Sequence, residues 1–278
     1  MAIISVLNHK GGVGKTTVSV NLAAGLSIQE ERKHKDPKPV LLVDLDDQLN
    51  ATMIACGGPH NSASYMPMIT VEESFPKALL DGFGNYDHLL AESKIPIDSE
   101  LKVHVFKTDH EKMIELPFML HNQKDGETQL QRFLQPIQDY YSHIIIDNPP
   151  SLNIIPVASL IASQYTLVPI EPDPLSIIGL SSIFATINRV RREKNPQLKV
   201  IGVVPSRVRI ARKRYMEAIE EINQGYPDLV LPYIKDLVEV EDANMSGSDI
   251  FSFTAPQSQP YRQFLKVVRS VIERIEED

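Results

Sequence analysis

The chain has 278 residues, of which 42% are hydrophobic, and a formal net charge of −8. This length and apolar share are sufficient for one large α/β domain, which we expect to span residues 1–278. The single cysteine, Cys56, excludes internal disulfide bonds and a four-cysteine zinc site. No apolar run approaches the roughly 18 residues of a membrane span, and no signal peptide is recognised, so we expect a cytoplasmic protein.

Short, almost continuously apolar segments alternate along the chain with segments of helical spacing. The expected strands are residues 2–8, 39–44, 101–106, 143–147, 165–170, 199–204 and 229–232. The expected helices lie near residues 15–29, 72–80, 109–120, 126–141, 152–162, 176–194, 211–224 and 258–276. Continuously apolar strands are typical of a sheet that is covered on both faces. The sequence therefore predicts a doubly wound, mainly parallel α/β sheet with helices on both faces and ligands at the carboxyl ends of its strands.

The first expected strand is followed by the sequence Lys-Gly-Gly-Val-Gly-Lys-Thr-Thr at residues 10–17. A strand that leads through a glycine-rich turn into a helix is a phosphate-binding P-loop. His9 stands where the usual pattern has its first glycine, and Lys10 adds a second lysine at the loop entrance. We therefore expect nucleotide contacts from Gly11, Gly12, Val13, Gly14, Lys15, Thr16 and Thr17. Of these, Lys15 is placed to reach the β- and γ-phosphates, and the Thr16 hydroxyl to ligate Mg²⁺.

Carboxylates follow two other expected strands. Asp44 ends the expected strand 39–44 and Asp46 follows it, and side chains at alternate positions of a continuing strand would point to opposite sides. An alternative is that this acidic cluster only caps a short helix near residue 50. Asp147 ends the strand 143–147, where an acidic residue is typical of a Walker B aspartate that holds Mg²⁺. Here the alternative is an ordinary strand end, since Asp-x-Pro is common in turns.

Three segments resemble the deviant Walker ATPases: residues 10–17, residues 44–52 and residues 145–151. Their early lysine marks the superfamily, and the run Asp-Leu-Asp-Asp-Gln-Leu-Asn-Ala-Thr is most similar to the ParA-type partition ATPases, which are related to MinD and to nitrogenase iron proteins. The resemblance implies a P-loop NTPase fold, bound ATP and Mg²⁺, and ATP hydrolysis that is weak unless stimulated. It also implies a homodimer that encloses two ATP molecules.

Roles for single residues follow from the same resemblance. Lys10 matches the signature lysine that crosses to the nucleotide of the partner subunit, and Lys15 matches the lysine that contacts the nucleotide of its own subunit. Asp46 matches the carboxylate that positions the attacking water, so the implied catalytic residues are Lys10, Lys15 and Asp46. The implied magnesium-site residues are Thr16, Asp44 and Asp147.

The chain departs from the family pattern at Asp47, where proline is usual, at Leu49, where glycine is usual, and at Asn148. These changes leave the named carboxylates in place and put the loop geometry, and with it the hydrolysis rate, in question. No helix-turn-helix precedes the P-loop, so we do not expect the longer type that represses its own operon. By position alone, we place the adenine contacts at Pro205–Ser206 and at Tyr233–Asp236.

Residues 187–215 carry ten Lys and Arg residues against one acidic residue, in a chain that is acidic as a whole. Clustered basic residues are typical of nucleic-acid binding, and the resemblance implies non-specific binding of double-stranded DNA. The alternative is a basic surface that pairs with the acidic remainder or with an acidic protein. The expected DNA-binding residues are Arg189, Arg192, Arg209, Arg212, Lys213 and Arg214.

The expected function is that of a partition ATPase on the nucleoid, which a ParB-like or cargo-adaptor protein resets by stimulating hydrolysis. A MinD-like membrane switch would use the helix near 258–276, but that helix ends in acidic residues, which anionic lipid would repel. An iron–sulfur reductase is excluded, because it needs two cysteine ligands in each subunit and Cys56 is the single cysteine. A small-molecule kinase would need neither Lys10 nor the basic segment. A scaffold that binds nucleotide without hydrolysis stays open because of Asp47.

Overall fold

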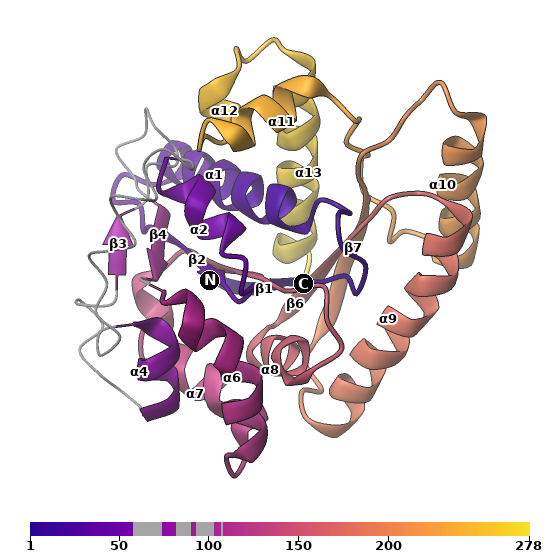
Figure 1. Cartoon of the computed structure of the whole chain (residues 1–278). Helices are drawn as coiled ribbons and strands as arrows, with labels where there is room; N and C mark the ends of the chain where they lie inside the picture. Colours follow the sequence, from indigo (N-terminus) through magenta and orange to yellow (C-terminus); the bar gives the residue numbers. More distant parts are fainter. Residues whose placement is uncertain (58–73, 82–89, 93–102, 107) are drawn as a thin grey trace.

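The structure is a computed structural model that describes residues 1–57, 74–81, 90–92, 103–106 and 108–278. Its strands form one seven-stranded sheet in the order β3-β4-β2-β5-β1-β6-β7 (Figure 1). Among the strands that the structure describes, only β3 is antiparallel to its neighbour; the other six are parallel. The strands are β1 (Ala2–Val6), β2 (Val40–Asp44), β3 (Leu90–Glu92), β4 (Val103–Phe106), β5 (His143–Asp147), β6 (Tyr165–Ile170) and β7 (Lys199–Pro205).

Helices cover both faces of the sheet, as the continuously apolar strands predict (Figure 1). Against one face lie α1 (Lys15–Lys33), α2 (Asn50–Ala55), α11 (Val238–Met245), α12 (Ile250–Phe253) and α13 (Gln259–Glu276). Against the other lie α4 (Phe75–Asp81), α6 (His110–Asn122), α7 (Gln129–Leu134), α8 (Ile154–Ala162) and α9 (Pro174–Glu193), with α10 (Lys213–Gly225) beside α9. Successive residues of a strand point to the hydrophobic cores on opposite faces of the sheet: Ile4 packs with α1, while Ile3 packs with α8.

The structure differs from the sequence prediction in several details. Residues 229–232 form no strand, because only Val230 makes a bridge to Val203. The region 126–141 is not one helix: α7 ends at Leu134, before Pro136, and 3₁₀ turns lie on either side. Proline lacks an N–H donor and clashes with the preceding turn. The strand β3 and the helices α11 and α12 were not predicted. Residues 72–73 and 101–102 of the predicted elements lie outside the described residues.

The last helix packs in the core, as its apolar stripe predicts. Its side chains Phe264, Val268 and Val271 are buried against α1. At Gly25 the two helices come so close that an added Cβ would lie 2.5 Å from a methyl group of Val268. Among the helices that the structure describes, none is long and apolar enough to cross a membrane.

Candidate functional site

The loop between β1 and α1 has the backbone that a P-loop needs. Gly12 and Gly14 have φ values of 74° and 83°, in the left-handed region that favours glycine. Gly14 is also the residue from which α1 starts, so the free N–H groups of the first helical turn face the loop. Asn8 anchors the loop entrance: its Nδ2 donates to the Pro169 carbonyl (2.7 Å), and its Oδ1 accepts from the Lys10 N–H (2.9 Å).

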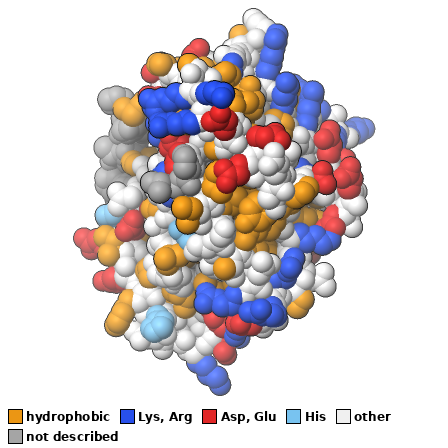
Figure 2. Space-filling view, turned by 90° about the vertical axis from the view of Figure 1, so that its right-hand side faces the viewer, with side chains coloured by type: hydrophobic (Ala, Val, Ile, Leu, Met, Phe, Trp, Pro, Cys, Tyr) orange, Lys and Arg blue, Asp and Glu red, His pale blue; other side chains and the backbone are white. Residues whose placement is uncertain are grey.

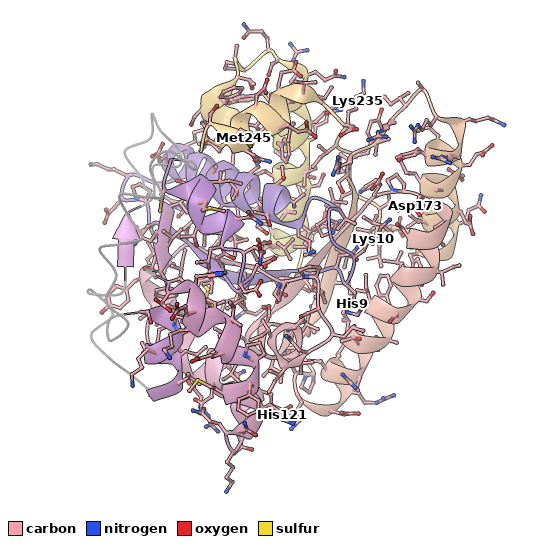
Figure 3. The ribbon with its side chains drawn as sticks, viewed as in Figure 1. His9, Lys10, His121, Asp173, Lys235 and Met245 are labelled. Carbon is pink, nitrogen blue, oxygen red and sulfur yellow. The ribbon has the colours of Figure 1, made fainter. Side chains whose placement is uncertain are left out.

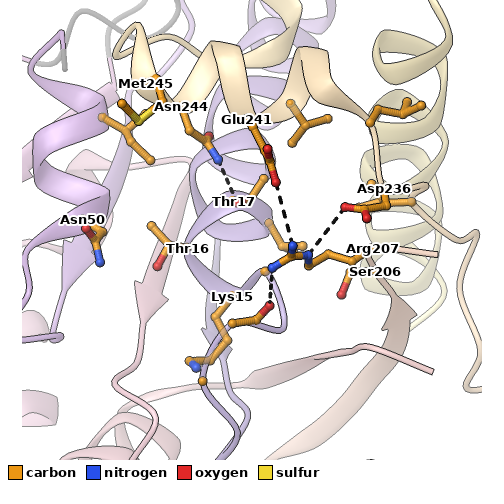
Figure 4. A pocket seen from close by; sticks show the side chains of 18 of the residues that line it. Lys15, Thr16, Thr17, Asn50, Ser206, Arg207, Asp236, Glu241, Asn244 and Met245 are labelled. Atoms are coloured by element: carbon orange, nitrogen blue, oxygen red, sulfur yellow. Dashed lines mark hydrogen bonds and ion pairs between the residues drawn. The ribbon is translucent and has the colours of Figure 1, made fainter. Parts of the chain in front are cut away.

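A cavity of about 510 Å³ opens beside this loop (Figure 4). One wall consists of P-loop residues and the start of α1, and another of Asp46, Gln48 and residues of α2. The third wall comes from the far end of the sequence, namely the segment after β7 and the helix α11. This wall includes Ser206, Arg207, Lys235, Asp236, Leu237, Val240, Glu241, Asn244 and Met245. The size suits a nucleotide, since small-molecule sites have volumes of roughly 300–1,000 Å³.

Lys15 lies beneath the loop with its side chain buried, at 6% relative exposure. Its Nζ donates to the Lys10 carbonyl over 3.1 Å. Burial lowers the pKa of Lys15, and the charges of Asp147 and Asp46 oppose this shift. A buried ammonium group near glycine N–H groups is the donor set that phosphate oxygens require.

Asp147 and Thr16, which the sequence paired as magnesium-site residues, meet directly. The Thr16 Oγ1 donates to Asp147 Oδ2 (2.8 Å), and Ser19 Oγ donates to Asp147 Oδ1 (2.8 Å). Burial raises the pKa of Asp147 to about 6, although both hydroxyls and Lys15 oppose the shift. A hydroxyl and a carboxylate side by side supply the oxygen ligands that Mg²⁺ prefers.

Asp44 and Asp46 have different surroundings. Asp44 is buried and does not line the cavity; its carboxylate accepts from the Asp46 N–H and from the N–H and hydroxyl of Thr52. Burial, with the nearby Asp147, raises the pKa of Asp44 to about 8. Asp46 does line the cavity. The strand ends at Asp44, so the alternation expected for a continuing strand does not apply.

The backbone at Leu49 has a conformation that favours glycine. Its φ is 51°, in the left-handed region, where a leucine is strained. Its side chain is fully buried, which offsets part of that strain. Asn148, the other departure, is also fully buried, and its Nδ2 donates to Ser5 Oγ and to the Val6 carbonyl. These bonds tie the end of β5 to β1.

Lys10 points away from the cavity of its own chain (Figure 3). Its Nζ forms an ion pair with Asp173 Oδ2 (2.8 Å) and lies 3.3 Å from Ser176 Oγ, at the start of α9. The side chain is 47% exposed. Its position therefore leaves the ammonium group at the protein surface, beside the P-loop.

Of the residues expected on the adenine side, only some line the cavity. Pro205 does not line the cavity. It is the last residue of β7, and its carbonyl accepts a hydrogen bond from the Ile234 N–H (2.8 Å). The next residues, Ser206 and Arg207, do line it, and their side chains bond to the P-loop carbonyls of Val13 and Gly12. Lys235 and Asp236 also line the cavity, whereas Tyr233 does not.

Sequence reasoning missed Ser19, Arg207 and Asn244. The Asn244 Nδ2 donates to Thr17 Oγ1 over 3.0 Å, so α11 contacts the P-loop helix directly. Ser19 had a local signal, since it lies one turn after Lys15 and Thr16. Arg207 and Asn244 had none, because their contacts depend on the folding of distant segments.

The six expected DNA-binding residues are all exposed and come from two regions, the end of α9 and the segment 209–214. Arg212 precedes the first residue of α10, and no acidic residue lies in the first turn of that helix. Arg209 pairs with Asp236 (2.7 Å), and Lys213 pairs with Glu217 (2.9 Å). Figure 2 shows the Lys and Arg side chains of this side in separate groups, with hydrophobic side chains between them. The six residues therefore come from two segments, and acidic partners neutralise part of their charge.

Comparison with known proteins assigns the family. Residues 1–200 match a family model described as an AAA domain. The sporulation initiation inhibitor protein Soj of Bacillus subtilis is 30% identical over 270 residues, which cover 97% of each chain. The chromosome partitioning protein ParA of Myxococcus xanthus is 32% identical over 228 residues, or 81% of this chain and 71% of that protein.

Solved structures agree on the fold. A McdA variant of Cyanothece, in complex with ATP, has a TM-score of 0.79 at 20% identity, over 99% of this chain and 96% of that chain. The septum site-determining protein MinD of Pyrococcus horikoshii, with Mg-ADP, has a TM-score of 0.71 at 18% identity, over 97% and 95%. These relatives and the P-loop at the carboxyl end of a parallel sheet show that the chain belongs to the AAA-domain family and, within it, to the Soj/ParA proteins.

Proposed function

We propose that this protein is a partition or positioning ATPase that binds ATP and Mg²⁺, dimerises around two nucleotides and binds DNA non-specifically in that form. The observation that carries the proposal is the contact between Thr16 and Asp147, directly beside the buried Lys15 and the glycine-rich loop. The relative named as a chromosome partitioning protein, ParA of Myxococcus xanthus, supports the biological role.

The residues present fit MgATP. The N–H groups of residues 11–17 and the Lys15 ammonium would bind the phosphates, and Thr16 with Asp147 would hold Mg²⁺. Bound Mg²⁺ supplies charge neutralisation at the phosphates. Asp46 lines the same cavity and is the carboxylate that would orient the attacking water, while Asp44 holds the loop of Asp46 in place.

Dimerisation is supported by the surface around the P-loop. Lys10 lies at this surface, where its ammonium group can leave Asp173 for the nucleotide of a partner subunit. Two apolar side chains are exposed in the segments that contact the loop: Leu152, at 73%, follows Pro150, and Ile178, at 72%, follows Ser176. A nucleotide-dependent dimer would cover both.

Binding of DNA is supported by the start of α10. Arg212, Lys213 and Arg214 oppose the helix dipole there, which destabilises a helix by typically about 0.3–1 kcal/mol for each charge. Such an arrangement favours a polyanionic partner over a purely structural role. In the proposed cycle a ParB-like or cargo-adaptor protein stimulates hydrolysis, and the dimer leaves the nucleoid.

The test combines light scattering, ATP hydrolysis and DNA binding with ATP, with ADP and without nucleotide. We expect a dimer and DNA binding with ATP alone. In the variant Lys10→Ala we expect hydrolysis and dimer formation to suffer more than nucleotide binding by the monomer. A protein that stays monomeric with saturating ATP and Mg²⁺, even as Asp46→Ala, would refute the proposal. Normal dimers without any hydrolysis would support the non-hydrolysing scaffold instead.

A further inference from the structure

Arg207 has a strained backbone that aims its side chain at the P-loop. It follows β7 and lies beyond residues 1–200, which the family model matches. Its φ is 53°, in the left-handed region, which is strained for a residue other than glycine. The neighbouring N–H groups of Ser206 and Val208 donate to the carbonyls of Ile170 and Ile234, which hold this conformation. Strain that is held so firmly points to a function for the side chain.

The guanidinium group of Arg207 uses few of its hydrogen-bond donors. An arginine has five N–H donors. Among the described residues, its one hydrogen bond goes to the Gly12 carbonyl, over 3.1 Å. Asp236 and Glu241 attract it from 3.6 and 3.8 Å, which is too far for a good hydrogen bond (Figure 4). Asp236 instead accepts from Arg209, over 2.7 Å. Most donors of Arg207 are therefore available to a ligand in the cavity.

The charges of the cavity identify that ligand. Asp236 and Glu241 stand on the wall opposite the P-loop, where they would repel a phosphate chain. Arg207 lies between these carboxylates and Gly12, and a planar guanidinium fork suits phosphate oxygens. We propose that Arg207 is a further nucleotide-binding residue, which donates hydrogen bonds to the phosphate groups of the nucleotide that the P-loop holds. This inference rests on the proposed function, since it concerns the same site.

The test measures nucleotide affinity by calorimetry for ATP and AMP, together with thermal unfolding in the absence of nucleotide. Hydrogen bonds to charged groups contribute strongly to binding affinity. We therefore expect Arg207→Ala to weaken ATP binding about tenfold or more, and AMP binding less. Arg207→Lys should recover part of the loss. Arg269→Ala, at an exposed site on α13, is the matched control and should bind like the unmodified protein. Equal affinities for ATP in Arg207→Ala and the unmodified protein would overturn the inference, and so would equal losses for ATP and AMP.

A second variant separates phosphate binding from a purely structural tether to α11. If Arg207 serves the phosphates, Glu241→Gln removes a competing and repelling carboxylate, so ATP should bind at least as tightly as before. If Arg207 only ties α11 to the P-loop, the same variant breaks the tether, and weaker ATP binding would contradict the inference. An unmodified protein that binds no ATP would instead refute the proposed function itself.

Discussion

Two helical glycines of this protein should respond in opposite ways to the same substitution. Replacing a glycine inside a helix by alanine normally stabilises the protein by roughly 0.5–1 kcal/mol, because alanine loses less backbone entropy on folding. Gly179 lies in α9, and no atom of the described residues outside its own stretch of helix lies within 4 Å of an added Cβ, so Gly179→Ala should show this gain. Gly25 lies in α1, where the added Cβ would meet Val268 at 2.5 Å and the Phe251 ring at 3.0 Å.

The contact at Gly25 should outweigh the entropy gain. Val268 is β-branched and buried, so it cannot swing aside. Overpacking of a core typically costs about 1–3 kcal/mol, so we expect Gly25→Ala to lower the free energy of unfolding by about 1–2 kcal/mol. Urea denaturation of both variants measures the difference. The double variant Gly25→Ala, Val268→Ala should lose less than the two single variants together, because the smaller side chain removes the clash. Equal stabilisation by both alanines would refute the close approach of α1 and α13.

Three further predictions concern charge. His143 is partly buried at the start of β5, and burial lowers its pKa to about 4 from the ordinary 6.5. As the pH falls, the unfolded chain protonates at this histidine before the folded protein does, so stability is lost between pH 6.5 and 4. Relative to the variant His143→Gln, the free energy of unfolding should fall by about 2 kcal/mol from pH 7 to 4.5. Curves of unfolding free energy against pH that run parallel for the two proteins would contradict this. Lys15→Ala should abolish the rise in melting temperature that MgATP produces, and an unchanged rise would exclude this lysine from the phosphate site. Removal of the charges of Arg212, Lys213 and Arg214 should weaken DNA binding and flatten its salt dependence in a gel shift with ATP, and an unaltered shift would exclude this surface.

The core of the nucleotide site was readable from the sequence because its chemistry is local. The turn at residues 10–17 needs glycines where φ is positive, and Gly12 and Gly14 occupy those positions. Asp147 follows a continuous apolar strand, so its place at the carboxyl end of the sheet also follows from local pattern. The parallel sheet covered on both faces was predicted for the same reason.

Tertiary structure alone decided which distant residues complete the site. The third wall of the cavity comes from residues 206–245, including α11, whose short helix has no strong periodic signal. Arg207 and Asn244 reach the P-loop only because β7 and α11 pack beside it. Likewise, Lys10 meets Asp173 across a sequence separation of 163 residues. Hydrophobic spacing and turn chemistry act between neighbours in the chain, whereas these contacts depend on how the strands are arranged in the sheet. The residues of the loop could therefore be predicted, while the residues that surround it had to be seen in the fold.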